Sequence, residues 1–82
     1  MDTTDNIIER PSHYTRYSTE PVQFIMENNL PFWLGNVVKY ALRAGYKQYP
    51  DASASESEVL DLRKVIRYCE MRINQIEGRD VL

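Results

Sequence analysis

The apolar residues in the C-terminal part of this 82-residue chain recur at the spacing of one long helix. Successive members lie alternately three and four residues apart, a heptad-like pattern that spans about five helical turns. We call this set the apolar seam, and its members are Val59, Leu62, Ile66, Cys69, Ile73 and Ile76. Ser55 and Glu58 match a Ser-x-x-Glu capping box, which predicts the start of this helix, and Gly78 predicts its end. As a seam member, Cys69 is expected to be a small buried hydrophobic residue.

Two shorter helices are predicted before the long one. Pro21 suits the first turn of one helix, an apolar stripe follows it, and Asn28-Asn29 ends it. Pro31 starts the second helix, Phe32-Trp33 is expected to anchor the core or a subunit interface, and Gly45 ends the helix. Two short helices cannot cover the whole apolar seam, so a second copy of the chain is expected to bury part of it. The predicted fold is all-α: a small bundle of two short helices and one long C-terminal helix, packed in a homo-oligomer.

One helical domain is predicted over residues 20–78, with an irregular arm at 1–19 and a tail at 79–82. Pro11 and the Ser and Thr residues around it disfavour helix in the arm. Residues 46–55 are predicted to be a polar surface connector, with a mobile lid over a site as the alternative.

The composition limits the cellular compartments in which the protein is expected to act. No stretch approaches the roughly 18 apolar residues of a membrane span, and the first five residues do not form a signal peptide. A single cysteine excludes a disulfide within the chain. These features predict a cytoplasmic protein without a membrane partner.

Candidate chemistry gathers in the second predicted helix, where residues 34–45 carry a polar stripe opposite an apolar one. The polar stripe consists of Asn36, Lys39, Tyr40 and Arg43. Residues 28–50 contain no Asp or Glu, although the whole chain has a net charge of −2, and Lys47 adds a further cation. A compact basic segment in an acidic protein predicts an anion site and not the extended basic surface that binds nucleic acid. The alternative is an ordinary solvated face of an amphipathic helix.

Further candidates lie elsewhere in the chain. Asp61, Lys64 and Tyr68 align on the long helix, on the side opposite the apolar seam. If the two helices pack side by side, Lys64 extends the cationic patch; the alternative is an exposed charged face with a local Asp61–Lys64 pair. In the arm, His13 is the only histidine and Tyr14 follows it. His13 is either part of a site or an exposed or capping residue, and no metal site is predicted because it has no partner ligands at usable spacing.

The sequence lacks the residues that several classes of enzyme need for catalysis. The three glycines are too far apart for a phosphate-cradling loop, and no Ser-His-acid or Cys-His set is readable. Glu58 and Asp61 supply one Glu-x-x-Asp pair, but no earlier helix carries the matching Glu-x-x-Glu of metal-dependent nucleoside triphosphate hydrolysis.

The order of motifs resembles a family of small bacteriophage proteins, formerly of unknown function and commonly described as phage nucleotide kinases. The resemblance covers about residues 10–75 and is carried by Pro11-Ser12-His13-Tyr14, Glu20-Pro21 with Phe24-Ile25, Gly35-Asn36-Val37-Val38-Lys39-Tyr40 with Arg43-Ala44-Gly45 and Lys47, and Asp61-Leu62 with Lys64 and Tyr68. It implies nucleotide handling and homo-oligomerisation. By analogy of size and site chemistry, the chain is also similar to small oligomeric phage proteins that sequester nucleotide signals of bacterial immunity.

The resulting hypothesis is a phage protein that acts in the cytoplasm of an infected bacterium and binds a small-molecule nucleotide without a cofactor. Cations hold the phosphate, an amide fixes a base or ribose edge, a phenol stacks, and the histidine closes the site. In that order, these residues are Lys39, Arg43 and Lys64; Asn36; Tyr14, Tyr40 or Tyr68; and His13. The hypothesis favours sequestration of a cyclic nucleotide or an ADP-ribose-type signal. The alternatives are a nucleoside monophosphate kinase, which would need Mg²⁺ and ATP, and an inhibitor that contacts a host protein.

Overall fold

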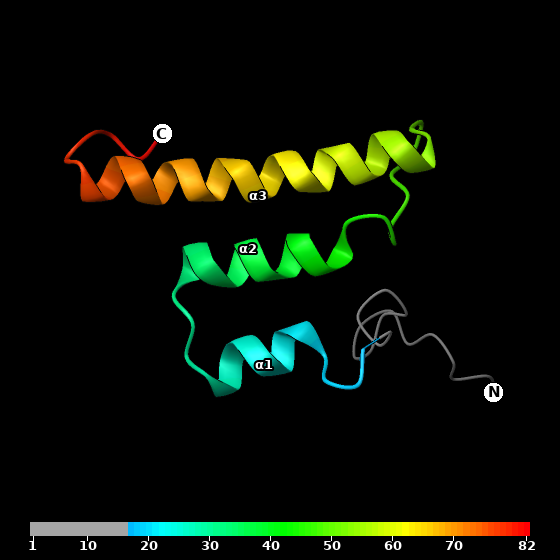
Figure 1. Cartoon of the computed structure of the whole chain (residues 1–82), viewed down its shortest axis with the longest axis horizontal. Helices are drawn as coiled ribbons and strands as arrows, with labels where there is room; N and C mark the ends of the chain where they lie inside the picture. The colour runs from blue at the N-terminus through cyan, green and yellow to red at the C-terminus, as the bar shows by residue number, and fades with distance from the viewer. Residues whose placement is uncertain (1–16) are drawn as a thin grey trace.

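A computed structural model describes residues 17–82, which form three helices and no strand. They are α1 (Pro21–Glu27), α2 (Phe32–Arg43) and α3 (Ala54–Ile76). The helices lie side by side in one layer, with α2 in the middle and in contact with both neighbours (Figure 1). The prediction of an all-helical chain with two short helices and one long helix is confirmed.

The sequence signals at the helix ends act where they were expected. Pro21 is the first residue of α1, and Asn29 follows that helix in the left-handed conformation at φ 52°. Gly45 follows α2 at φ 86°, and Gly78 follows α3 at φ 77°. Both glycines thus occupy a conformation that a side chain with Cβ rarely adopts.

The start of α3 differs from its prediction. The capping box forms two residues earlier, where Ser53 Oγ accepts from the Glu56 amide at 3.1 Å and Glu56 Oε1 accepts from the Ser53 amide at 2.7 Å. Two overlapping Ser-x-x-Glu quartets occur here, and the predicted one, Ser55 to Glu58, was wrong. Ala54 and Ser55 tolerate helical backbone, so α3 extends to the earlier serine.

The apolar side of α2 packs against α1. A Cβ added at Gly35 would meet Ile25 Cγ2 at 3.0 Å, so the glycine permits this close approach. Val38 and Leu42 of α2 share a small cavity wall with Phe24 of α1. This leaves the polar side of α2 for α3.

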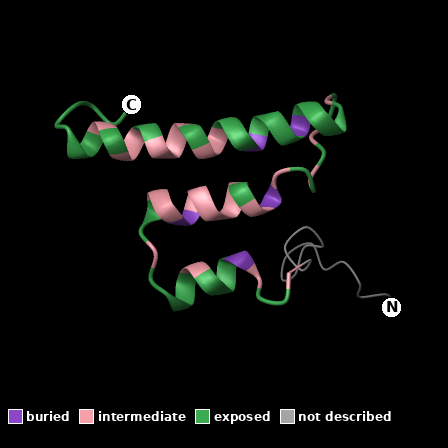
Figure 2. Cartoon of the chain, in the orientation of Figure 1, coloured by how far each residue is buried: buried purple, intermediate pink, exposed green. Residues whose placement is uncertain are grey.

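The polar side of α3 meets α2, whereas most of the apolar seam stays exposed. Ser57 and Asp61 are fully buried, while the seam residues other than Cys69 keep exposed fractions of 44–66% (Figure 2). Cys69 is half-buried, so its expected burial was wrong for the single chain. Apart from the ring of Pro21, no apolar side chain among residues 17–82 is buried. The described chain therefore lacks a conventional hydrophobic core.

None of α1, α2 and α3 combines the length and apolar character needed to cross a membrane.

Candidate anion-binding site

A buried polar cluster joins α2, α3 and the loop between them. Asp61 on α3 is fully buried and Arg43 on α2 keeps 7% of its surface exposed. Arg43 Nη2 lies 3.2 Å from Asp61 Oδ1, forming a buried ion pair. The desolvation of both groups makes this pair sensitive to the loss of either partner.

Tyr49 completes this cluster from the loop. Its hydroxyl donates to Asp61 Oδ1 at 2.5 Å and accepts from Arg43 Nη2 and, at 2.9 Å, from Lys64 Nζ. One donated and two accepted bonds use the full capacity of a phenol oxygen. The Tyr49 amide also donates to the buried Ser57 Oγ at 2.8 Å, so both ends of the residue are anchored on α3.

Sequence reasoning did not assign Tyr49 or Ser57 to the site. A signal existed for Ser57, because it lies four residues before Asp61 and continues the stripe formed by Asp61, Lys64 and Tyr68. For Tyr49 there was no comparable signal, since loop residues have no periodicity. The prediction that residues 46–55 merely connect two helices misses this anchoring role.

Three ammonium groups surround the cluster and approach two phenol rings. Lys39 Nζ lies 4.6 Å and Lys64 Nζ 4.8 Å from the centre of the Tyr40 ring. Lys64 Nζ also lies 4.6 Å from the Tyr49 ring, and Lys47 Nζ lies 5.2 Å from it. We call Lys39, Lys47, Lys64, Tyr40 and Tyr49 the cation–phenol patch. These distances are within the range of cation–π attraction.

The charges of this region do not cancel. Asp61 is matched by Arg43, and none of the three patch lysines forms an ion pair with a carboxylate of residues 17–82. All three lysines are half-buried, so water screens their mutual repulsion only in part. An anion bound at this patch would relieve that repulsion.

Aromatic rings continue the patch along the α2–α3 contact. Tyr40 and Tyr68 stack with ring centres 6.1 Å apart and an interplanar angle of 11°. Phe32 also meets Tyr68, in an edge-on arrangement with ring centres 6.0 Å apart.

The structure brings together most of the residues predicted for the site, but in different situations. Around the patch lie Lys39, Tyr40, Arg43, Lys47, Asp61, Lys64 and Tyr68. Asn36 instead donates to the Phe32 carbonyl of its own helix at 2.9 Å. His13 and Tyr14 lie outside the described residues.

Arg43 differs most from its predicted role as a phosphate ligand. Its guanidinium is buried and already engaged by Asp61 and Tyr49. Lys39 and Lys64 are less buried than Arg43, and the Lys64 ammonium also donates to the Tyr49 hydroxyl. Arg43 is therefore a structural cation, and the half-buried lysines are the better candidates for contact with an anion.

Metal ligands do not converge in the part of the chain that the structure describes. Among residues 17–82, no three His, Cys, Asp or Glu side chains come close enough to hold one metal ion.

Comparison with known proteins places the chain in a family. Comparisons with curated proteins and with solved structures found no match. A family model matches residues 8–70, which is more than half of the chain and includes α1, α2 and most of α3. The chain therefore belongs to the family described as protein of unknown function (DUF3310).

Proposed function

We propose that the cation–phenol patch binds the phosphate of a nucleotide and that the protein sequesters a cyclic nucleotide or ADP-ribose-type signal in the cytoplasm of a phage-infected bacterium. The observation that carries this proposal is the convergence of Lys39, Lys47 and Lys64 without a matching carboxylate among the described residues. Charge-assisted hydrogen bonds from ammonium groups to phosphate oxygens are among the strong ones in proteins.

The phenol rings support a ligand that has more than a phosphate. Tyr40 and Tyr68 form a stacked pair beside the lysines, and aromatic faces of this kind accept flat heteroaromatic rings. Extended nucleic acid is not proposed as the ligand, because the chain is acidic overall.

The test mixes the purified protein with mononucleotides, cyclic di- and trinucleotides and cyclic ADP-ribose isomers, and measures the shift in melting temperature. Bound material is released by heat denaturation and identified by chromatography. Intact ligand recovered in stoichiometric amount supports sequestration. Turnover to a phosphorylated product, with ATP and Mg²⁺ present, favours the nucleoside monophosphate kinase alternative. If no nucleotide shifts the melting temperature, both proposals fail and contact with a host protein becomes the working hypothesis.

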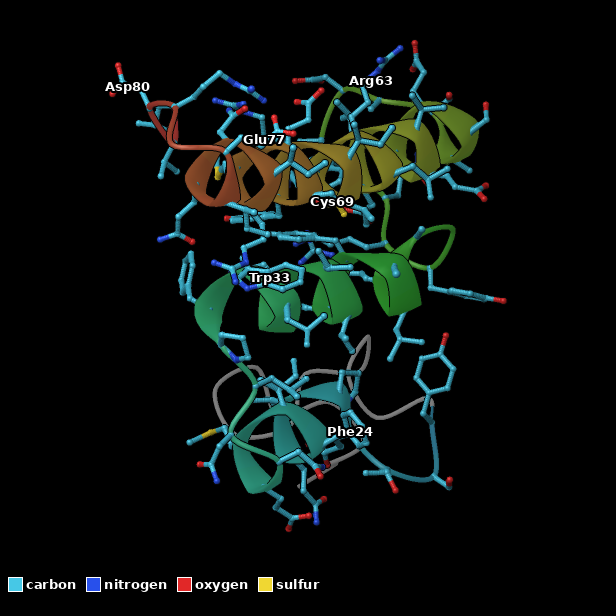
Figure 3. All side chains as sticks on the ribbon, turned by 60° about the vertical axis from the view of Figure 1, so that its left-hand side comes forward. Phe24, Trp33, Arg63, Cys69, Glu77 and Asp80 are labelled. Carbon is cyan, nitrogen blue, oxygen red and sulfur yellow. The ribbon has the colours of Figure 1, made fainter. Side chains whose placement is uncertain are left out.

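Two variants make this test specific. Lys39→Ala removes one ammonium group whose only contact with the described part of the chain is to a ring, so it is expected to weaken phosphate binding by about tenfold without unfolding the protein. Arg63→Ala is the matched control, because Arg63 is exposed and projects from α3 away from α2 (Figure 3). Equal affinities of the two variants would contradict a role for the patch.

We also propose that the protein acts as a homo-oligomer in which a second copy pairs along the apolar seam. One heptad position of the seam holds the β-branched residues Val59, Ile66 and Ile73, which favour parallel two-stranded coiled coils, and the other holds Leu62, Cys69 and Ile76. Each copy would then bury the apolar surface that it leaves exposed alone.

Single-cysteine variants test this pairing. Ile66→Cys in a Cys69→Ser background is expected to form a disulfide-linked dimer under mild oxidation, because identical positions face each other in a parallel seam. Leu60→Cys in the same background is the control, since Leu60 is similarly exposed at 43% but lies off the seam. A crosslink that appears only when Ile66→Cys retains the native Cys69 would indicate antiparallel pairing. A monomer at all concentrations in light scattering would overturn the proposal.

A further inference from the structure

A cavity of about 480 Å³ lies beyond the cation–phenol patch, between the start of α2 and the later turns of α3. Three of its walls are the aromatic side chains Phe32, Trp33 and Tyr68. Figure 3 shows Trp33 on the α2 ribbon, below the side chains that fill the space between α2 and α3. The volume lies within the range of small-molecule pockets, about 300–1,000 Å³.

One ring contact links the cavity to the patch. Tyr68 lines the cavity and stacks on Tyr40, and Tyr40 in turn lies against the ammonium groups of Lys39 and Lys64. From the Tyr68 ring, one step of 6.1 Å leads to Tyr40 and a second step of 4.6–4.8 Å leads to the lysines. A ligand with a flat ring at one end and a phosphate at the other would span from the cavity to the lysines across the Tyr68–Tyr40 pair, whereas inorganic phosphate would occupy only the lysine end.

The polar groups of the cavity suit a ring that carries hydrogen-bond acceptors. Arg72 lies over the Trp33 ring at 5.8 Å and donates from Nη1 to Gln75 Oε1 at 2.8 Å. This bond orients the Gln75 carboxamide so that its amide hydrogens remain for another acceptor. Among residues 17–82, no carboxylate lines the cavity. Aromatic walls with donors from Arg72 and Gln75 match the edge and faces of a nucleobase with carbonyl or ring-nitrogen acceptors.

We propose that this cavity is the base subsite for the nucleotide whose phosphate the patch lysines hold. This inference rests on the proposed function, because it assigns the base end of the same ligand. It assigns Phe32 and Trp33 the role of a surface on which the base stacks at the α2–α3 contact. The sequence had predicted these two residues as an anchor of the core or of a subunit interface.

Trp33 provides the measurement, because it is the only tryptophan in the chain. Intrinsic fluorescence is titrated with the four common ribonucleoside 5′-monophosphates, with a cyclic dinucleotide, and with ribose 5-phosphate and pyrophosphate as ligands without a base. Affinities for all ligands are measured in parallel by calorimetry. At least one nucleotide is expected to change the Trp33 emission and to bind at least tenfold more tightly than ribose 5-phosphate, which leaves the emission unchanged.

The double variant Arg72→Met, Gln75→Leu separates the two ends of the site. It removes the donors of the cavity while keeping similar apolar stems, so the preference for nucleotide over ribose 5-phosphate is expected to fall to about twofold or less. Its affinity for pyrophosphate is expected to stay within about twofold of the original protein. Arg63→Met is the matched control, since it removes a guanidinium that faces away from α2.

The outcomes distinguish this inference from the proposed function. If nucleotides and ribose 5-phosphate bind equally well and neither changes the Trp33 emission, the patch binds phosphate but the cavity is not a base subsite. If neither pyrophosphate nor any nucleotide binds, the proposed function fails, and the base subsite fails with it.

Discussion

The two sides of α3 reverse the usual distribution of polar and apolar residues. The side that packs on α2 carries Ser57 and Asp61, both fully buried, and the stacked ring of Tyr68. The apolar seam lies on another side, where Ile66 keeps 56% and Ile76 keeps 66% of its surface exposed. In a self-sufficient helical bundle the apolar stripe would face the neighbouring helix.

The difference indicates that the two sides have different tasks. Hydrogen bonds and ion pairs require defined geometry, so the polar side sets the register of α2, α3 and Tyr49 around the cation–phenol patch. Apolar burial is non-directional and proportional to area, which suits a surface used for association. In the proposals made above, the polar side holds the residues of the anion site and the apolar seam pairs with a second copy of the chain.

The largest loss of stability is expected when one member of the buried ion pair on the polar side is removed. Arg43→Met or Asp61→Leu alone is expected to lower the free energy of unfolding by about 3–5 kcal/mol, because each leaves a buried charge without its partner. Urea denaturation monitored by circular dichroism measures this loss.

The double variant Arg43→Met, Asp61→Leu is the control for that prediction. It removes both charges and is expected to recover most of the stability, within about 1–2 kcal/mol of the original protein. Losses that simply add in the double variant would show that the pair is not coupled.

A charge placed in the apolar seam is expected to disrupt the proposed pairing of two copies. Ile66→Lys places an ammonium group in the centre of the proposed pairing surface of each copy, so the dissociation constant is expected to rise at least a hundredfold, about 3 kcal/mol. Sedimentation velocity over a concentration series measures the effect. Leu60→Lys, at a similarly exposed position off the seam, is expected to change the association by less than about threefold. Similar behaviour of both variants would remove the distinction between the seam and the rest of α3.

A finer test removes one oxygen from the loop anchor. Tyr49→Phe keeps the ring but deletes the hydroxyl that bridges Arg43, Asp61 and Lys64, and is expected to cost about 1–3 kcal/mol of unfolding free energy. Thermal or urea unfolding gives this value. Tyr46→Phe serves as a comparison on a more exposed phenol of the same loop. An unchanged stability for Tyr49→Phe would mean that the loop does not depend on this bridge.

The smallest expected loss of stability comes from the cap at the start of α3, which belongs neither to the polar side nor to the apolar seam. Ser53→Ala removes the capping oxygen and is expected to cost about 1 kcal/mol. Hydrogen bonds from the Ser53 amide and then the Ser53 side chain lower the pKa of Glu56 from its ordinary value of 4.5. Because the folded state favours the ionised carboxylate, this contribution is present above pH 4.5 and declines as the pH falls through the lowered pKa.

Glu56→Gln checks the sign of that pH effect. Its stability relative to the original protein is expected to be lower at neutral pH, and the difference is expected to shrink as the solution is acidified. A difference that grows on acidification would contradict the assignment of Glu56 as an ionised cap.

Local signals predicted the helices well. Proline at helix starts, Asn29, Gly45 and Gly78 at helix ends, and the repeat of the apolar seam are each encoded within a few turns of the chain. The capping box was displaced because two overlapping quartets satisfy the same local pattern. The grouping of Lys39, Tyr40, Lys64 and Tyr68 was also anticipated, since helical periodicity places such residues on one side and only the side-by-side packing of α2 and α3 had to be assumed.

The sequence by itself determined the helical elements, the separation of polar from apolar stripes and the acid-free segment that carries the cations. Only the tertiary structure decided that the polar stripes of α2 and α3 face each other. It also decided that Arg43 forms an ion pair with Asp61 and that Tyr49 of the loop donates a hydrogen bond to Asp61. The physical reason is that periodicity defines the sides of a helix but not which side a neighbour covers. That choice depends on the joint energy of burying Arg43, Asp61 and Tyr49 together, which no single segment contains.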